Sequence, residues 1–195
     1  MTDAGVWWGG WQRVHDQMRD TGRLHSKRDV SPSAAIIDSQ TVKTTEKGGC
    51  GFDGGKLIKG RKRHMAVNTQ GVILSVQVHA AGIQVREGAK PLLHRQRGRF
   101  PRLEKVFADG GYAGHLEEWA PEETGFDLEI VHKPPDQKGF PVLPKRWVVE
   151  RTFAWCGRYR RLSKDDEELP ARSESMIHLA MTHRMLRRLA PAGSL

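Results

Sequence analysis

Two short apolar runs, far apart in the chain, each end in an aspartate. Asp38 follows residues 34–37, and Asp109 follows residues 106–108 and precedes two glycines. Short apolar runs bounded by turn residues predict buried strands. A carboxylate at the end of a buried strand loses hydration unless a cation or a hydrogen-bond donor receives it. The two runs therefore predict a sheet whose strand ends carry a charged site.

A third acid, Glu150, lies within the helix-like stretch 144–162. Two carboxylates from strand ends and one from a helix form an open set of oxygen ligands, which suits Mg²⁺ or Mn²⁺. Such sets support two-metal phosphoryl transfer on nucleic acid. Asp38, Asp109 and Glu150 are therefore the candidate catalytic residues and metal ligands, provided that the fold brings them together.

Each acid also has a simpler interpretation. Asp38 could accept hydrogen bonds from serine or backbone donors at the end of a strand. Asp109 with the following glycine is typical of a type I′ hairpin turn, although the helical pattern that comes next disfavours a hairpin. Glu150 could form a surface ion pair with Arg146 four residues earlier, worth only about 0.2–0.5 kcal/mol.

The chain is strongly basic. Its 195 residues carry a formal net charge of +9, and lysine and arginine gather in segments 56–63, 95–102, 158–161 and 184–188. Repeated basic clusters indicate a polyanionic partner, and nucleic acid is the simplest choice. The alternative for any one cluster is a solvated basic face. The length suits one domain with one core.

Cysteine usage and hydropathy predict the compartment. Cys50 and Cys156 stand alone, so neither a disulfide framework nor a zinc knuckle is indicated. No uninterrupted apolar stretch reaches the roughly 20 residues of a membrane helix. We therefore expect a cytoplasmic protein that makes no contact with membrane.

The periodicity of apolar residues predicts an α/β fold. Residues 1–30 are expected to be a short irregular segment with a short helix over 11–21, and residues 31–190 the main domain. A mixed five-stranded sheet should combine a three-stranded antiparallel meander with parallel strands and carry helices on both faces. The predicted strands are 34–42, 61–68, 72–80, 105–108 and 128–131. The predicted helices are 87–97, 113–120, 144–162 and 171–189, whereas the glycine-rich segment 48–60 and residues 132–142 are predicted loops.

Four blocks stand in a definite order along the chain: Ile36 to Lys43, Gly54 to His64, Phe107 to Tyr112 and Arg146 to Trp155. Together they resemble the DDE transposases of bacterial insertion sequences, in the group named after insertion sequence five. The resemblance implies a ribonuclease H-like fold and the triad Asp38, Asp109 and Glu150, holding two Mg²⁺ ions or Mn²⁺ in their place. It further implies DNA transposition, in which an endonuclease cleaves the insertion-sequence ends and joins them to a target.

The resemblance has departures. Related enzymes carry a Tyr, Arg, Glu, Lys signature around the glutamate; Arg146 fits it, but Leu143 stands at the tyrosine position and Gly157 at the lysine position. Only about 30 residues precede the first predicted strand, and the resemblance implies that residues 1–30 are the remnant of an end-binding region. Two alternatives therefore stay open. One is an inactive truncated transposase that acts as a DNA-binding inhibitor or is a relic, and the other is a ribonuclease H-like nuclease without strand transfer.

The expected partner is double-stranded DNA, both the terminal inverted repeats and the target, bound by a homodimer. Basic side chains should follow its phosphate backbone, and each neutralised phosphate should steepen the salt dependence of binding by about 0.9 in log-log slope. The predicted DNA-binding residues are Lys43, Lys56, Lys59, Arg61, Lys62, Arg63, Arg146, Arg158 and Arg161.

Overall fold

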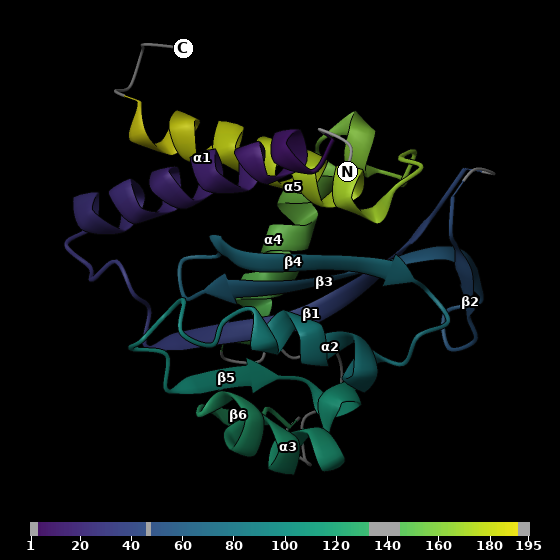
Figure 1. Ribbon diagram of the computed structural model, residues 1–195, viewed down its shortest axis with the longest axis horizontal. Coiled ribbons are helices and arrows are strands. Elements are labelled where there is room, and N and C mark those ends of the chain that lie inside the picture. The colour runs from purple at the N-terminus through teal and green to yellow at the C-terminus, as the bar shows by residue number, and fades with distance from the viewer. Residues whose placement is uncertain (1–3, 46–47, 133–144, 191–195) are drawn as a thin grey trace.

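The computed structural model describes residues 4–45, 48–132 and 145–190, with the side chains of residues 4–8 left out. Its centre is one mixed sheet with helices on both faces (Figure 1). The strands are β1 (Ala34–Lys43), β2 (Gly51–Asp53), β3 (Ile58–Asn68), β4 (Ile73–Ala80), β5 (Lys105–Ala108) and β6 (Asp127–Ile130).

The sheet has an antiparallel half and a parallel half. β1 pairs antiparallel with β3, and β3 pairs antiparallel with β4. On its other edge β1 pairs parallel with β5, and β5 pairs parallel with β6. The strand order β4-β3-β1-β5-β6 is that of a ribonuclease H-like fold and confirms the predicted meander with parallel strands added.

A short sixth strand, β2, lies in the segment that was predicted to be a loop. It pairs antiparallel with β3 through Gly51 opposite Gly60. Asp53 at its end accepts hydrogen bonds from the backbone N–H groups of Gly55 and Lys56, at 3.1 Å each, and from the hydroxyl of Thr41 at 2.6 Å. One aspartate thus orders a turn that glycine content alone would leave flexible.

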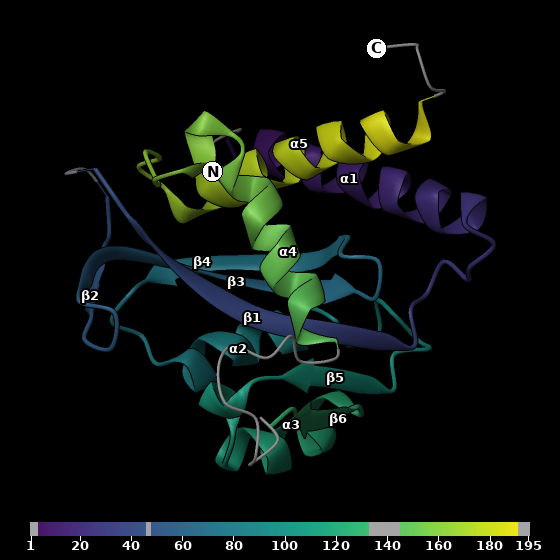
Figure 2. The same ribbon diagram turned by 180° about the vertical axis from the view of Figure 1, so that it is seen from behind.

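The helices are α1 (Ala4–His25), α2 (Val85–His94), α3 (His115–Thr124), α4 (Arg146–Gly157) and α5 (Pro170–Leu189), with short 3-10 turns at Gly110–Tyr112 and Arg160–Leu162. Two apolar cores fill the faces of the sheet. One is formed with α2 and α3, which contribute Leu92 and Leu116, and the other with α4 and α5, which contribute Val149 and Ile177. α4 crosses the sheet while α1 and α5 lie side by side above it (Figure 2).

The N-terminal segment is helical, so the expectation of an irregular segment was wrong. α1 spans 22 residues and packs on α5, where His15, Arg19 and Arg23 become buried. Asp16 pairs with both Arg19 and Arg99, which ties α1 to the body of the fold. Several glycines lower the intrinsic helix propensity here, and tertiary packing overcomes it. Its assignment as the remnant of an end-binding region stays a prediction.

The helix that carries Glu150 is shorter than expected. α4 ends at Gly157 and is followed by a separate 3-10 turn, instead of continuing to residue 162. The predicted loop over 132–142, the helix start at Pro144 and the departure at Leu143 fall on residues 133–144, outside the described residues. None of the helices in the described ranges is long and apolar enough to cross a membrane.

Buried histidines should make the fold sensitive to acid. Burial is the largest cause that lowers the pKa of His15, lowers that of His64 well below its usual range and lowers that of His178 to about 3. The unfolded chain binds protons at these sites from about pH 6.5 downwards, so stability is lost as the pH falls from there towards the folded pKa values.

We expect the free energy of unfolding to fall by about 2–3 kcal/mol between about pH 7 and pH 5, as measured by urea denaturation. Asp38, whose pKa is raised to about 6, opposes this trend, because its folded form takes up a proton in the same range. The variant His178→Gln should show a shallower pH dependence than the natural chain. A flat profile from pH 7 to pH 5 would contradict the neutral state of these imidazoles.

Candidate active site

The sheet places Asp38 beside Asp109. β1 and β5 are parallel neighbours with Ile36 opposite Phe107, so two residues further along each chain the two aspartates lie at corresponding positions. Ile36 and Phe107 both face the core beneath α4. Side chains alternate between the faces of a sheet, and Asp38 and Asp109 therefore face α4 as well.

α4 brings Glu150 to the same place. Val149 and Phe153 anchor the helix in the core, and the ammonium of Lys145, just before the helix, lies 3.6 Å from the centre of the Phe107 ring. Arg146 then joins two of the acids: its Nη2 is 3.4 Å from Asp109 Oδ2 and 3.1 Å from Glu150 Oε1. The ion pair between Arg146 and Glu150 exists, but the same guanidinium also contacts the strand-end acid, so it is more than a surface helix pair.

Asp38 carries an energetically costly charge. Burial, which is the largest cause, and the neighbouring charge of Asp109 together raise its pKa to about 6. The backbone N–H of Ser39 donates to Asp38 Oδ1 at 2.6 Å and opposes the shift. In the described part of the chain, no cation forms a salt bridge with Asp38. A cation bound here would relieve the repulsion between the two aspartates.

Asp109 does not form the hairpin turn that its sequence could support. Its Oδ1 accepts a hydrogen bond from the backbone N–H of Gly111 at 2.9 Å, which caps a 3-10 turn that leads towards α3. The carboxylate is thereby held at the end of β5.

Tyr112 is a component that sequence reasoning did not single out. It is buried with its hydroxyl 3.4 Å from His64 Nδ1. Burial, followed by the charge of Asp38, raises the pKa of Tyr112 well above its usual range. The tyrosine is therefore neutral and packs beside the acids from the α2 side. The sequence signal that could have identified Tyr112 was its place at the end of the block Phe107 to Tyr112, one of the four blocks that carry the family resemblance.

The donor chemistry fits a hard divalent cation. Three carboxylates supply oxygen ligands of the kind that Mg²⁺ and Mn²⁺ prefer, and the charges of Arg146 and Lys56 offset the cost of burying Asp38 only in part. As the side chains stand, no group of three acid, histidine or cysteine residues within the described ranges is spaced to hold a metal ion. Arg146 instead contributes positive charge between Asp109 and Glu150.

Replacing Asp38 by asparagine should stabilise the metal-free protein. At about pH 8 we expect Asp38→Asn to raise the free energy of unfolding by about 1–2 kcal/mol, because it removes a poorly solvated charge. The gain should disappear near pH 4, where the folded carboxyl is already protonated. Thermal or urea unfolding at both pH values measures this, with the exposed Asp127→Asn as the matched control. A variant less stable than the natural chain at pH 8 would refute the argument.

Three predicted DNA-binding residues, Arg61, Lys62 and Arg63, have a different role. Arg61 and Arg63 are buried. Arg61 donates to the backbone oxygens of Gly49, Glu167 and Glu168 at 2.8, 2.7 and 2.6 Å, and its Nη1 lies 3.4 Å from the buried Asp165. The prediction that these arginines contact DNA was wrong: strand alternation directs both into the interior.

Arg63 and Lys62 also have their hydrogen-bond partners inside the protein. Arg63 donates to the backbone oxygens of Leu162 and Lys164 at 2.7 and 2.9 Å. Lys62 is also buried, on the other face, where its ammonium donates to the oxygen of Ile83 at 2.8 Å. These three cations fasten β3 to distant loops, and none of them presents its charge to solvent.

The other predicted cations remain at the surface or at the site. Lys43, Lys56 and Lys59 are exposed, as are Arg158 and Arg161. Lys56 acts electrostatically on Asp38. Arg161 forms an ion pair with Glu167 at 2.8 Å, and Arg146 is engaged by the acids. Their contact with DNA stays a prediction.

The fold defines a class, a ribonuclease H-like domain, and the assignment of Asp38, Asp109 and Glu150 as its DDE triad stays a prediction. Residues 30–185 match the family described as the Transposase DDE domain. The chain belongs to this family. Membership in the insertion-sequence-five group stays a prediction.

Individual relatives are more distant. A putative transposase for insertion sequence element IS402 of Burkholderia cepacia is 29% identical over 110 residues, which cover 53% of this chain and 52% of that protein. The matched region thus spans about half the length of the curated relative.

Two solved structures are similar at low sequence identity. A chain of the simian T-cell lymphotropic virus intasome in complex with PP2A regulatory subunit B56 gamma has a TM-score of 0.49 and 17% identity, over 85% of this chain and 57% of that one. The catalytic domain of Mos1 mariner transposase has a TM-score of 0.43 and 10% identity, over 91% of this chain and 89% of that one.

Proposed function

We propose that this chain is the catalytic domain of a transposase that cleaves DNA at the ends of an insertion sequence and joins the ends to a target. The observation that carries the proposal is the convergence of Asp38, Asp109 and Glu150 on one face of the sheet. The family of the chain supports the reaction class, and the exposed basic side chains support DNA as the substrate.

The acids would act by positioning and by charge. Asp38 and Asp109, fixed on adjacent strands, would hold divalent metal on one side, and Glu150 on α4 would complete the ligand set. Two Mg²⁺ or Mn²⁺ ions bound there would supply an activated oxygen nucleophile and charge stabilisation at phosphorus. Buried side chains on three elements restrict the motion of these ligands, which keeps the reacting groups in line.

Arg146 has a second role in this proposal. In the metal-free protein it balances the charge of Asp109 and Glu150. When metal and DNA enter, its planar guanidinium would turn to a phosphate oxygen, for which its paired N–H donors are well suited. Arg146 would therefore couple the loading of the site with substrate binding.

DNA is the proposed partner as duplex terminal repeats and as target, bound by two copies of the chain. Exposed Lys43, Lys56 and Lys59 would follow the backbone near the acids, because Lys56 is close enough for its charge to act on Asp38. We place this reaction in the bacterial cytoplasm, at the nucleoid.

The test is a joining assay. The purified chain is incubated with Mn²⁺, a labelled duplex that carries a terminal repeat with a free 3′-hydroxyl, and a supercoiled target plasmid. Labelled plasmid is the expected product. Nicking without joining would support a ribonuclease H-like nuclease, and binding without nicking would support an inactive DNA-binding inhibitor; either result would overturn the proposal.

A further inference from the structure

A cluster of arginines extends from the middle of α4 to its C-terminal cap and across to α5. Five of them, Arg151, Arg158, Arg184, Arg187 and Arg188, come from α4, its C-terminal cap and α5. Within the described residues none of the five forms a salt bridge with a carboxylate, whereas other arginines of the fold do. Concentrated positive charge without acidic partners is the electrostatic footprint of an anion site.

The cluster surrounds a concavity. A cavity of about 450 Å³ is lined by Arg158, Arg184, Arg187 and Arg188 together with Trp155 and Tyr159. Tyr159 Oη lies 2.9 Å from His183 Nδ1, which fixes one wall. Side chains from both helices thus face a shared space that is large enough for a phosphate group and its neighbouring sugar.

Aromatic stacking holds the arginines in place. The guanidinium carbon of Arg184 lies 3.5 Å from the centre of the Trp155 ring, and that of Arg151 lies 4.7 Å from the same ring and 4.2 Å from Trp147. A stacked guanidinium can present its in-plane N–H donors to an oxygen ligand, although Arg151 already uses one of them, because its Nη2 donates to the backbone oxygen of Gln70 at 3.2 Å. The Nε atoms of Arg151 and Arg184 are buried without a hydrogen-bond partner.

The same packing has an electrostatic cost in the free protein. Burial, followed by the charges of Arg188 and Arg158, lowers the pKa of Arg184, and burial with the charge of Arg188 lowers that of Arg151. An anion in the cavity would relieve this repulsion, which is why the arrangement favours a bound ligand.

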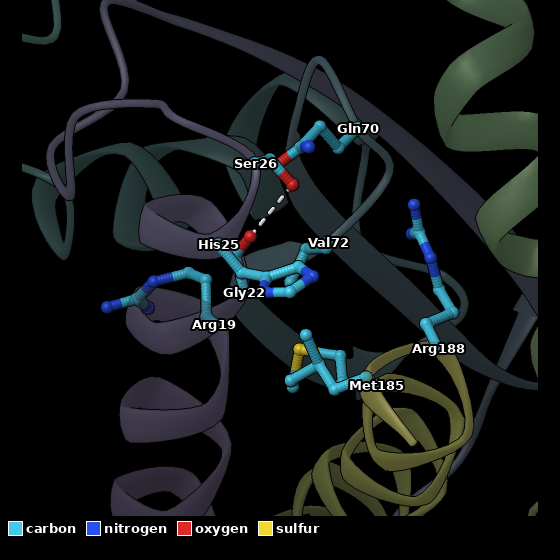
Figure 3. A pocket seen from close by; sticks show the side chains of 9 residues that line it. Arg19, Gly22, His25, Ser26, Gln70, Val72, Met185 and Arg188 are labelled. Carbon is cyan, nitrogen blue, oxygen red and sulfur yellow. Dashed lines mark hydrogen bonds between the residues drawn. The ribbon is translucent and has the colours of Figure 1, made fainter. Parts of the chain in front are cut away.

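The cluster continues towards α1. Arg188 also lines a second pocket, between α1, the turn that joins β3 to β4, and α5 (Figure 3). There Arg188 extends from α5 on the side opposite Arg19 of α1, with Met185 and Val72 between them (Figure 3). Arg19 is already paired with Asp16 and Asp20, so Arg188 is the cation of this pocket without a carboxylate partner in the described chain.

We propose that this arginine cluster is a second binding site for the phosphate backbone of DNA, separate from the acid site. The inference rests on the proposed function for the identity of the polyanion. From Glu150 to Arg158 the helix rises about 12 Å, which corresponds to roughly three or four base-pair steps of duplex. A duplex whose reacting phosphate lies at the acids could therefore place a neighbouring phosphate against the arginines.

The test measures the salt dependence of DNA binding. Fluorescence anisotropy with a labelled duplex compares the natural chain with Arg187→Gln/Arg188→Gln, both exposed positions, and with Arg184→Gln. We expect the double variant to bind about tenfold more weakly and to lower the log-log salt slope by about 1–2, since each phosphate contact contributes about 0.9. The matched control, Lys90→Gln/Arg97→Gln on the α2 side, removes the same charge and should leave the slope unchanged.

A salt slope that is unchanged in the double variant would overturn the proposal and point to an acidic protein partner instead. A slope lowered equally in the control would also overturn it, because the loss of any two positive charges would then have the same effect. Thermal unfolding confirms that each variant is folded. Metal-dependent nicking of plasmid at saturating protein separates this inference from the proposed function. If the double variant lowers the salt slope but the natural chain never nicks DNA, the second site is supported and the proposed function is not. If the natural chain nicks DNA but the double variant leaves the slope unaltered, the second site is refuted and the proposed function is not.

Discussion

Asp109→Asn should abolish metal-dependent DNA cleavage while leaving DNA affinity nearly intact. Asp109 is held at the end of β5 by its cap on Gly111 and lies beside Asp38 and Arg146. Losing one carboxylate from a set of three removes both a metal ligand and charge stabilisation in the transition state. We expect cleavage to fall by about 10³-fold or more, equivalent to roughly 4 kcal/mol of barrier.

Plasmid nicking in Mn²⁺ measures the chemistry, and anisotropy with the same duplex measures binding. Asp127→Asn, an exposed carboxylate on β6, is the matched control and should cleave at the natural rate. Asp38→Asn and Glu150→Gln should behave as Asp109→Asn does. Equal loss of binding and cleavage in all three would indicate that the acids support the fold or the DNA interface, and would contradict a metal site.

Arg61→Met should destabilise the protein strongly, in contrast to any role in DNA binding. The substitution leaves three backbone oxygens without their donor and leaves Asp165 buried beside an apolar side chain. Breaking a buried charged pair costs about 3–5 kcal/mol. Urea denaturation should show this loss, with the exposed Lys59→Met as a matched control of near-natural stability.

A second substitution separates the ion pair from simple loss of packing. Asp165→Asn added to Arg61→Met removes the unpaired carboxylate, so the double variant should recover part of the stability. Lys59→Met should lower the salt slope of DNA binding, whereas folded Arg61→Met should keep it. If Arg61→Met were stable and lowered the slope, the assignment of this arginine to the interior would be wrong.

Local patterns predicted the strands well, because apolar runs bounded by polar residues can be recognised without distant contacts. Asp109 follows the end of β5 as expected, but the expectation that Asp38 ends its strand was wrong, because β1 continues past it to Lys43. The adjacency of β1 and β5 could only be inferred from the order of elements and from family resemblance. The contact of Glu150 with Asp109 through Arg146 depends on where α4 crosses the sheet, which no local pattern specifies.

The basic residues show where a prediction from neighbouring residues in the sequence fails. Arg61, Lys62 and Arg63 look like a surface cluster in sequence, yet apart from the contact of Arg61 with Gly49 the two arginines donate to carbonyls of residues 162–168, about a hundred positions away. Similarly, α1 gains its stability from α5 at the other end of the chain, so its glycines were a misleading local signal.

Anomalous diffraction from crystals soaked in Mn²⁺ tests the central claim most directly. If the three acids hold divalent metal, manganese density is expected among the carboxylates of Asp38, Asp109 and Glu150, with Arg146 moved away from at least one of its two acids. Manganese elsewhere, with Arg146 still bound between Asp109 and Glu150 at saturating ion concentration, would contradict it.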